Sequence, residues 1–223
     1  MTSSPPILPP FAAANTVIIA TVAEYAESHP LYEKRRAEYY AAFSRFFSYG
    51  IPIYAVASET AQLQAAENSA IAVFKPFLAG FSTLERTGTL KIGSKEVLSL
   101  RTLFKVMDLP DSSWVVKFSG RYLLTDDTLL AAVRDAHSDC NFIGRVAIEP
   151  SAEGPQLYTF GFAMRWGWLK RFIEVAATGF GNKNIERCMY EFLGENGLLA
   201  TATLLPRLGM FVNVANSGTY KWV

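Results

Sequence analysis

A continuous apolar stretch rich in β-branched residues, TVIIATVA at 16–23, limits the possible folds of this chain more than any other feature. Apolar residues at consecutive positions, rather than at alternate ones, are typical of strands that are covered on both faces, as in parallel sheets. A second such stretch, IPIYAVAS at 51–58, follows a helical pattern over 31–49. Strand, helix and strand in this order predict a right-handed crossover and a parallel sheet.

The rest of the chain continues this alternation of strands and amphipathic helices. We expect further strands at 70–76, 114–116, 141–148 and 157–165, and helices at 93–109, 126–137, 166–177 and 185–196. The segment 79–93 is interpreted as a loop with a short helix, and the tail after 196 is apolar and β-rich. The pattern predicts an α/β fold in which helices flank a mostly parallel sheet.

The helical pattern over 31–49 divides into an apolar stripe and a charged face. The stripe contains Leu31, Tyr39, Phe43, Phe46 and Phe47, and the opposite face contains Glu33, Lys34, Arg35 and Arg36. We therefore expect the stripe to pack on the sheet and the charged side chains to point away from it.

Length and composition indicate one domain. The chain has 223 residues, and 50% of them are hydrophobic, which is enough for one substantial core. The first 14 residues are rich in proline, and no repeat or change of composition marks a second unit. We expect a flexible leader over 1–14 and a single domain over 15–223.

Charge and residue counts argue against several classes of function. The net charge of +1 provides no basic field for unspecific nucleic-acid binding. Two cysteines and two histidines are too few for a disulfide framework or a histidine-based metal site. No stretch reaches the ~18 apolar residues of a membrane span, and the N-terminus lacks the pattern of a secretory signal. These features predict a cytoplasmic protein, and they leave its oligomeric state open.

The most unusual strand end is Trp114-Val115-Val116, which runs directly into Lys117-Phe118-Ser119-Gly120-Arg121-Tyr122. Lysine and arginine supply charge to a phosphate, and glycine lets the backbone approach a ligand closely. The alternative is a lysine that extends from a strand end and an arginine that pairs with a surface carboxylate. The phosphate-binding and the structural interpretations fit the composition equally well.

Ligands of open α/β sheets bind at the carboxyl ends of the strands, where the strand order reverses. This rule places Thr21 to Tyr25, Ala57 to Glu59 and Lys117 to Tyr122 around one crevice. The chain has no GxGxxG and no P-loop sequence, which argues against dehydrogenases and P-loop ATPases.

The order of elements from 16 to 195 resembles the nucleotide-sugar glycosyltransferases of the GT-A fold. Residues 117–122 match the Lys-x-Ser/Thr-Gly-Arg-Tyr pattern of glycosyltransferase-like proteins from bacteria and large viruses. Gly93-Ser94-Lys95-Glu96 loosely matches the Gly-x-Lys-Glu that often begins their preceding helix. The resemblance implies a single-domain GT-A fold and transfer of a sugar from a nucleoside diphosphate to an acceptor hydroxyl, as in glycan or polysaccharide synthesis.

The resemblance also assigns roles to individual residues. Glu186, which opens a late helix, would be the general base, and Lys117 and Arg121 would stabilise the departing diphosphate. Trp166 and Trp168 are candidates for stacking on an acceptor glycan, although core packing is the more common role of such residues. The implied donor-binding residues are Thr21, Val22, Ala23, Glu24, Tyr25, Ser58, Lys95, Ser119, Gly120 and Tyr122.

The better-known branch of that family holds Mn²⁺ or Mg²⁺ with an Asp-x-Asp motif. Here Ser119-Gly120-Arg121 stands in its place, and no Asp-x-Asp occurs in the chain. The resemblance therefore implies that no cofactor is required, although Mn²⁺ or Mg²⁺ stays possible. Asp126 and Asp127 are a weak alternative metal site, because adjacent acids at a helix start usually cap the helix.

Two other functions fit the same features. A GT-A-like domain without catalytic power would bind a glycan or a protein, and the missing acidic motif favours that alternative. A methyltransferase is a further alternative, against which the absence of a glycine-rich loop after 16–23 argues.

Overall fold

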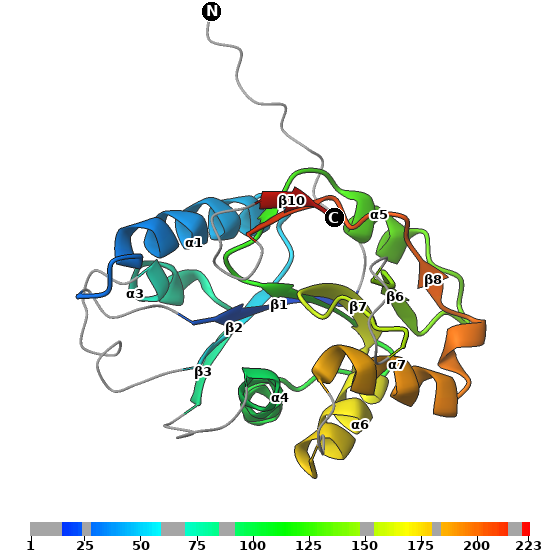
Figure 1. The fold of residues 1–223 in the computed structure, drawn as a ribbon. Coiled ribbons are helices and arrows are strands. Elements are labelled where there is room, and N and C mark those ends of the chain that lie inside the picture. The colour runs from blue at the N-terminus through cyan, green and yellow to red at the C-terminus, as the bar shows by residue number, and fades with distance from the viewer. Residues whose placement is uncertain are drawn as a thin grey trace, which may run out of the picture.

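A seven-stranded sheet forms the middle layer of the molecule (Figure 1). The computed structural model describes residues 15–23, 28–58, 70–84, 92–147, 154–179, 184–213 and 220–223. In spatial order the strands are β3 (Gly80–Leu84), β2 (Ile53–Ser58), β1 (Thr16–Val22), β4 (Trp114–Ser119), β7 (Gly161–Arg165), β6 (Phe142–Gly144) and β8 (Thr203–Leu204). A second, three-stranded sheet contains β10 (Tyr220–Trp222), β9 (Met210–Asn213) and β5 (Leu123–Leu124).

Helices and the small sheet cover the two faces of the middle layer (Figure 1). One face carries α1 (Tyr32–Phe47), α3 (Ala70–Phe74), α5 (Thr128–Arg134) and the small sheet. The other face carries α4 (Ile92–Thr102), α6 (Trp166–Ala177) and α7 (Ile185–Glu195). Short 3₁₀ turns complete the order: η1 (Lys75–Phe77), η2 (Leu103–Lys105) and η3 (Leu198–Ala200). None of the described helices combines the length and the hydropathy that crossing a membrane requires.

The sequence of β1 is apolar at consecutive positions because both faces of this strand are buried. Ile18 and Ala20 belong to the core cluster that contains the inner side of α1, and Val17 and Ile19 belong to the cluster under α4 and α6. Both sets of side chains are buried, because successive residues of a strand point to opposite faces. The predicted α/β fold with a doubly covered sheet is confirmed.

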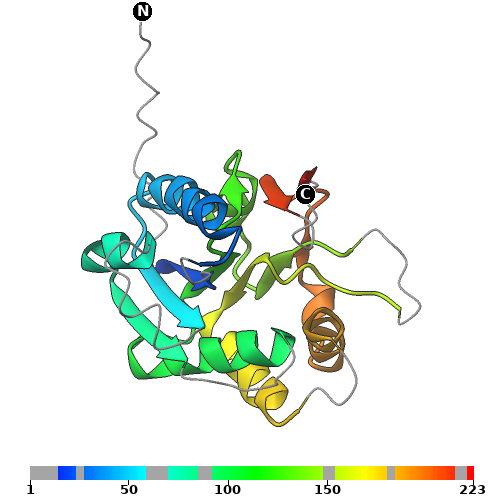
Figure 2. The same ribbon diagram turned by 60° about the vertical axis from the view of Figure 1, so that its left-hand side comes forward.

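The strand order reverses at β1. From β1 the chain continues outward to β2 and β3, and β4 then pairs with the other side of β1. All three of these neighbouring pairs are parallel, and β2 and β3 run side by side in one direction in Figure 2. β7 pairs antiparallel with β4 and with β6. A crevice is therefore expected where β1 and β4 end.

Two sequence predictions of elements are wrong. The segment 70–76 forms α3 and part of η1 instead of a strand, and the third parallel strand is β3, in a segment expected to be a loop with a short helix. In α3, Ala70, Ile71 and Phe74 are buried whereas Val73 is exposed. A short apolar run does not distinguish a buried strand from a buried helical turn, which is why periodicity failed here.

Candidate active site

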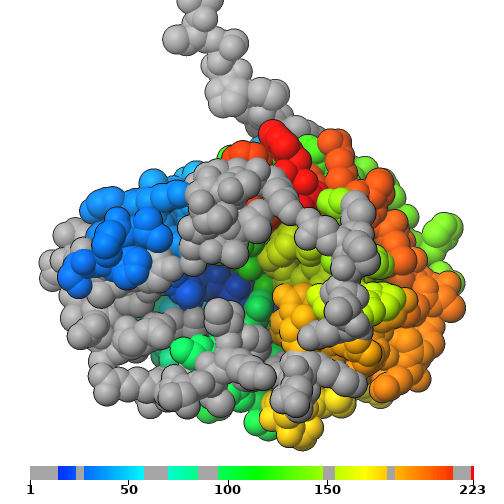
Figure 3. All heavy atoms as spheres, viewed as in Figure 1, coloured from blue at the N-terminus to red at the C-terminus, as the bar shows by residue number. Residues whose placement is uncertain are grey.

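The carboxyl ends of β1 and β4 meet, as the sequence predicted. Thr21 is paired with Ser119, and the Gly120 N–H donates a hydrogen bond to the Thr21 carbonyl at 2.8 Å. The next segment is tied to α1, because the Ala23 N–H donates to the Tyr39 hydroxyl at 2.7 Å. Figure 3 looks onto this edge and shows β1, in dark blue, set back below the blue α1.

The predicted donor-binding residues are only partly brought together at this edge. Thr21, Val22, Ala23, Ser119, Gly120 and Tyr122 lie there, with Val22 and Gly120 buried. Lys95 is half-buried on α4, one residue before Glu96. Glu24, Tyr25 and Glu59 lie outside the described residues, and Ser58 is described only through its backbone pairing with Leu84.

Gly120 lies against helix α1. A Cβ at this position would lie 3.1 Å from the Thr21 carbonyl oxygen and 3.3 Å from the rings of Tyr39 and Phe43. The glycine therefore lets the helix and the sheet approach each other. This packing explains the glycine without the close approach to a ligand that the sequence suggested.

The Gly120→Ala variant is expected to be less stable by about 1–3 kcal/mol, because the added methyl group overpacks this contact. The denaturant midpoint would measure the loss. Gly194→Ala, on the exposed side of α7, is a matched control that should be neutral or stabilising, since its added Cβ meets only Leu199 at 3.6 Å. Unchanged stability of Gly120→Ala together with weaker nucleotide binding would instead support the ligand role.

Lys117 is fully buried within β4. Its side chain points to the α4 side, because Val116 and Phe118 on either side of it belong to the α1-side core. Its Nζ donates to Glu96 Oε1 on α4 and, at 2.6 Å, to the Thr159 carbonyl. The charge of Lys117 is thus offset inside the protein, and the inward position contradicts the expectation that Lys117 contacts a diphosphate.

Glu186 opens α7 beside this buried ion pair. The helix start is capped by Asn184, whose Oδ1 accepts a hydrogen bond from the Arg187 N–H at 2.8 Å. Thr159 donates its hydroxyl hydrogen to Glu186 Oε1 at 3.2 Å. Burial raises the pKa of Glu186, and the negative charge of Glu96 raises it further, against the lowering effects of a backbone hydrogen bond at Glu186 itself, of Thr159 and of Lys117. A half-buried carboxyl group with a raised pKa is suited to accept a proton.

A second charged cluster lies between α1 and the end of β4. The Arg121 guanidinium lies 4.5 Å from the centre of the Tyr122 ring, donates to the Tyr122 hydroxyl at 2.8 Å, and lies 4.0 Å from Glu38. Arg35 is 3.5 Å from the same Glu38 carboxylate. Burial raises the pKa of Tyr122, whereas Arg121 and Arg35 lower it. The Glu38 carboxylate is thus shared by two guanidinium groups, those of Arg35 and Arg121.

The position of Arg35 corrects a sequence expectation. Arg35 was placed on the charged face of its helix, but only 5% of it is exposed. It lies three residues after Tyr32 and four before Tyr39, both of which are buried on the core side of α1. That spacing was visible in the sequence and could have identified Arg35 as an inward charge.

The two tryptophans proposed for acceptor stacking lie at the opposite edge of the sheet. β7 is antiparallel to β4, so Arg165 pairs with Trp114 at the amino end of β4 and α6 begins there. Trp166 is 2% exposed and packs edge-on against Phe104, as a core residue. Trp168 is half-buried and contacts Phe192 and Arg171. The direction of β7, which the apolar pattern does not reveal, overturns the expected crevice-rim position.

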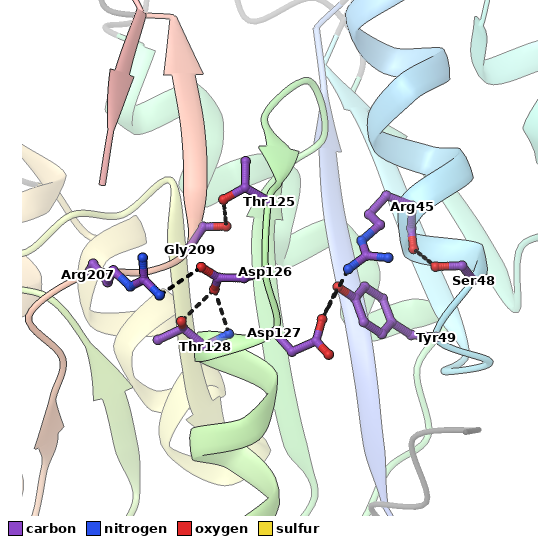
Figure 4. A network of polar contacts seen from close by, with 9 residues as sticks. All are labelled: Arg45, Ser48, Tyr49, Thr125, Asp126, Asp127, Thr128, Arg207 and Gly209. Atoms are coloured by element: carbon purple, nitrogen blue, oxygen red, sulfur yellow. Dashed lines mark hydrogen bonds and ion pairs between the residues drawn. The ribbon is translucent and has the colours of Figure 1, made fainter. Parts of the chain in front are cut away.

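Asp126 and Asp127 point to different partners (Figure 4). Asp126 accepts from the Thr128 N–H at 2.9 Å and lies 3.1 Å from Arg207. Desolvation raises the pKa of Asp126, but Thr128 and Arg207 lower it below its usual range.

Asp127 turns the other way in Figure 4, toward the carboxyl-terminal end of α1. It accepts from the Tyr49 hydroxyl at 2.8 Å and lies 3.2 Å from Arg45. Burial and this hydrogen bond raise the pKa of Tyr49. The two carboxylates thus anchor α5 and α1 and do not share a site. In the part of the chain that the structure describes, no three His, Cys, Asp or Glu side chains are grouped so that they could hold a metal ion.

Sequence reasoning missed two other members of the site, Glu96 and Thr159. Glu96 lies four residues before Leu100 and seven before Leu103, on the apolar stripe of α4. A carboxylate on an apolar helix face needs a charged or hydrogen-bonding partner, so this position could have predicted a buried ion pair. Thr159 joins the site through a loop conformation, for which the sequence gives no comparable signal.

Comparisons with known proteins support the fold. No protein-family model and no curated sequence matches the chain. Among solved structures, a protein from Bacillus anthracis assigned as a glucose-1-phosphate thymidylyltransferase, in complex with a sucrose, aligns with a TM-score of 0.56 at 9% identity, covering 85% of this chain and 86% of that one.

Two glycosyltransferases also align. One is involved in the glycosylation of the major capsid of PBCV-1, with a TM-score of 0.50 at 5% identity, covering 85% of this chain and 81% of that one. The other is the mannosyltransferase PcManGT from Pyrobaculum calidifontis, in complex with GDP-Man and Mn²⁺, with a TM-score of 0.51 at 15% identity, covering 86% and 55%. At such identities the likeness shows the fold, which is of the GT-A and nucleotidyltransferase-like α/β type.

Proposed function

We propose that the chain is a glycosyltransferase that moves a sugar from a nucleoside diphosphate to an acceptor hydroxyl in glycan or polysaccharide synthesis. The observation that carries the proposal is Glu186, whose pKa is raised by burial beside the Glu96–Lys117 ion pair, in which Lys117 lies two residues before the end of β4. The class of donor is inferred from aligned enzymes of this fold type, such as PcManGT, which binds GDP-Man.

In the proposed reaction, Glu186 accepts the proton of the acceptor hydroxyl. The acceptor oxygen forms the new bond to the anomeric carbon, and the bond from that carbon to the diphosphate oxygen breaks. The electron pair of that bond leaves with the diphosphate. The negative charge of the diphosphate is stabilised by a positively charged side chain.

Arg121 is the proposed partner of the departing diphosphate. The side chain of Arg121 is 17% exposed, whereas that of Lys117 is fully buried. The Arg121 guanidinium offers several N–H donors to phosphate oxygens. Because no Asp-x-Asp occurs in the chain, we propose that this cation acts without an obligatory metal ion. Activity should then persist in EDTA, and an activity that depends on Mn²⁺ would contradict this part of the proposal.

The donor is testable by release of nucleoside diphosphate from a panel of nucleotide sugars. At least one uridine, guanosine or thymidine diphosphate sugar should be hydrolysed slowly and should raise the melting temperature. Arg121→Gln is expected to weaken donor binding about tenfold or more, because charge-assisted hydrogen bonds contribute about 1.5–3 kcal/mol. Arg45→Gln, at the other end of α1, is the matched control and should bind the donor normally.

A nucleotidyltransferase is the second candidate, favoured by the alignment with the Bacillus anthracis protein. Such an enzyme would release pyrophosphate from a nucleoside triphosphate and a sugar phosphate, instead of nucleoside diphosphate from a nucleotide sugar. Measuring both products therefore separates the two reactions. Nucleotide-sugar binding without either product would favour a binding domain without catalytic power. Cytoplasmic location stays a prediction from the sequence.

A further inference from the structure

Five half-buried side chains form a continuous row of contacts, which we call the arginine–aromatic row: Arg121, Tyr122, Phe160, Tyr158 and Arg145. The Arg121 guanidinium lies 4.5 Å from the centre of the Tyr122 ring. The ring centres of Tyr122 and Phe160 are 5.6 Å apart, and those of Phe160 and Tyr158 are 4.8 Å apart. At the other end, the Arg145 guanidinium lies 5.5 Å from the centre of the Tyr158 ring.

The row begins at the proposed donor site and leads away from it. The Ser119 N–H donates to the Phe160 carbonyl at 2.8 Å, which joins the end of β4 to the segment before β7. The Tyr158 N–H donates to the Arg145 carbonyl at 2.9 Å, and the Ala147 N–H to the Gln156 carbonyl at 2.8 Å. These two bonds form the base of the arm, 145–147 with 154–158, that extends from the body of the protein in Figure 2.

The proposed general base lies beside the same segment. Thr159, between Tyr158 and Phe160 in the chain, turns the other way and donates to Glu186. The Leu157 N–H donates to the carbonyl of Glu186 at 3.3 Å. The row therefore meets the proposed donor site at Arg121, and the residue between its two central aromatic positions contacts the proposed general base.

Arg145 differs from the arginines that form ion pairs elsewhere on the protein. Arg45, Arg101, Arg134, Arg187 and Arg207 each lie within 3.2 Å of a carboxylate oxygen. Among the described residues, the structure gives Arg145 no carboxylate partner, and its buried Nε has no hydrogen-bond acceptor. Its guanidinium group lies over the face of the Tyr158 ring. A guanidinium group placed in this way keeps its capacity to bind an anionic group.

We propose that the arginine–aromatic row binds the acceptor and that the acceptor is an oligosaccharide bearing an anionic group, a carboxylate or a sulfate. The inference rests on the proposed function, since it names the acceptor of that same reaction. The aromatic rings offer apolar surface to the C–H faces of sugar rings, and Arg145 offers paired N–H donors to the acidic group. The row replaces Trp166 and Trp168, which lie at the other edge of the sheet, as the acceptor surface.

The test compares three oligosaccharides of equal length by calorimetry: a polygalacturonate fragment, a sulfated galactan fragment and the neutral galactan fragment. One acidic fragment should bind at least tenfold more tightly than the neutral one, and the tighter of the two identifies the anionic group. Arg145→Gln should remove about tenfold or more of that preference, and Arg145→Lys should retain part of it. Tyr158→Leu should weaken binding of acidic and neutral fragments alike.

The matched control is Arg134→Gln, which removes an exposed arginine on α5 that is paired with Asp135. It should bind every fragment as the unmodified protein does, and melting temperatures should confirm that each variant is folded. Equal binding of acidic and neutral fragments, or an unchanged preference in folded Arg145→Gln, would overturn the inference.

The outcomes also separate this inference from the proposed function. Release of nucleoside diphosphate without any preference for acidic fragments would overturn the acceptor assignment alone. Binding of an acidic fragment through Arg145 by a protein that hydrolyses no nucleotide sugar would support the row as a glycan site and contradict the transferase proposal.

Discussion

Replacing Lys117 with methionine is expected to lower the free energy of unfolding by about 3–5 kcal/mol, because it removes one partner of a buried ion pair. Lys117 is fully buried, and only 19% of the Glu96 side chain is exposed. The variant leaves the Glu96 carboxylate and the Thr159 carbonyl without the ammonium group that now contacts both. Urea unfolding of both proteins at neutral pH would measure the difference.

The double variant Lys117→Met with Glu96→Gln should recover much of the lost stability, because no uncompensated charge is left inside. Lys170→Met is the matched control on the surface. It removes an exposed ion pair with Asp111 and should cost less than about 1 kcal/mol. If Lys117→Met is as stable as the unmodified protein but binds nucleotide sugar poorly, Lys117 contacts the donor and the structural assignment is wrong.

Replacing Glu186 with glutamine is expected to lower turnover about 10²–10⁴-fold, since the amide cannot accept the proton of the acceptor hydroxyl. Donor binding should change little, because the proposed diphosphate contact is Arg121. Initial rates of sugar transfer at saturating donor would measure the effect. Glu195→Gln, at the end of the same helix, is the control and should transfer at the normal rate.

Stability provides a second check on Glu186→Gln. The pKa of Glu186 is raised in the folded state, so its ionisation costs stability as the pH rises through that pKa. Glutamine avoids this cost, and the variant should be at least as stable as the unmodified protein at neutral pH. A loss of activity that accompanies a lower melting temperature would indicate a structural role instead.

The pH dependence of transfer should reveal the influence of Glu96. Because the reaction needs ionised Glu186, its rate should fall as the pH decreases through the raised pKa of this group. Glu96→Gln removes a nearby negative charge that raises this pKa, so the acidic limb of the profile should move to lower pH. An acidic limb that stays in place would show that Glu96 does not act on Glu186.

Much of the scaffold was predictable from local patterns. The apolar runs at 16–23 and 51–58 identified two central strands, and the apolar spacing identified α6 and α7 almost to the residue. The carboxyl-end rule brought the end of β1 to the end of β4, which the pairing of Thr21 with Ser119 confirms. These features depend on the side-chain periodicity of single elements, which a sequence displays directly.

The composition of the site was less predictable, because it depends on contacts between elements distant in the chain. The sequence placed Glu186 at a helix start and Lys117 on a buried strand, but their joint contact with Thr159 arises from the packing of β4, α7 and the segment before β7.

The sequence by itself determined the α/β class, the two doubly covered strands and the helix start that carries Glu186. Only the tertiary structure decided that β7 runs antiparallel, that Trp166 consequently lies at the far edge, and that Lys117 turns toward Glu96 rather than toward a ligand. The physical reason is that alternation along a strand shows which residues share a face. It does not show what that face packs against or in which direction the neighbouring strand runs.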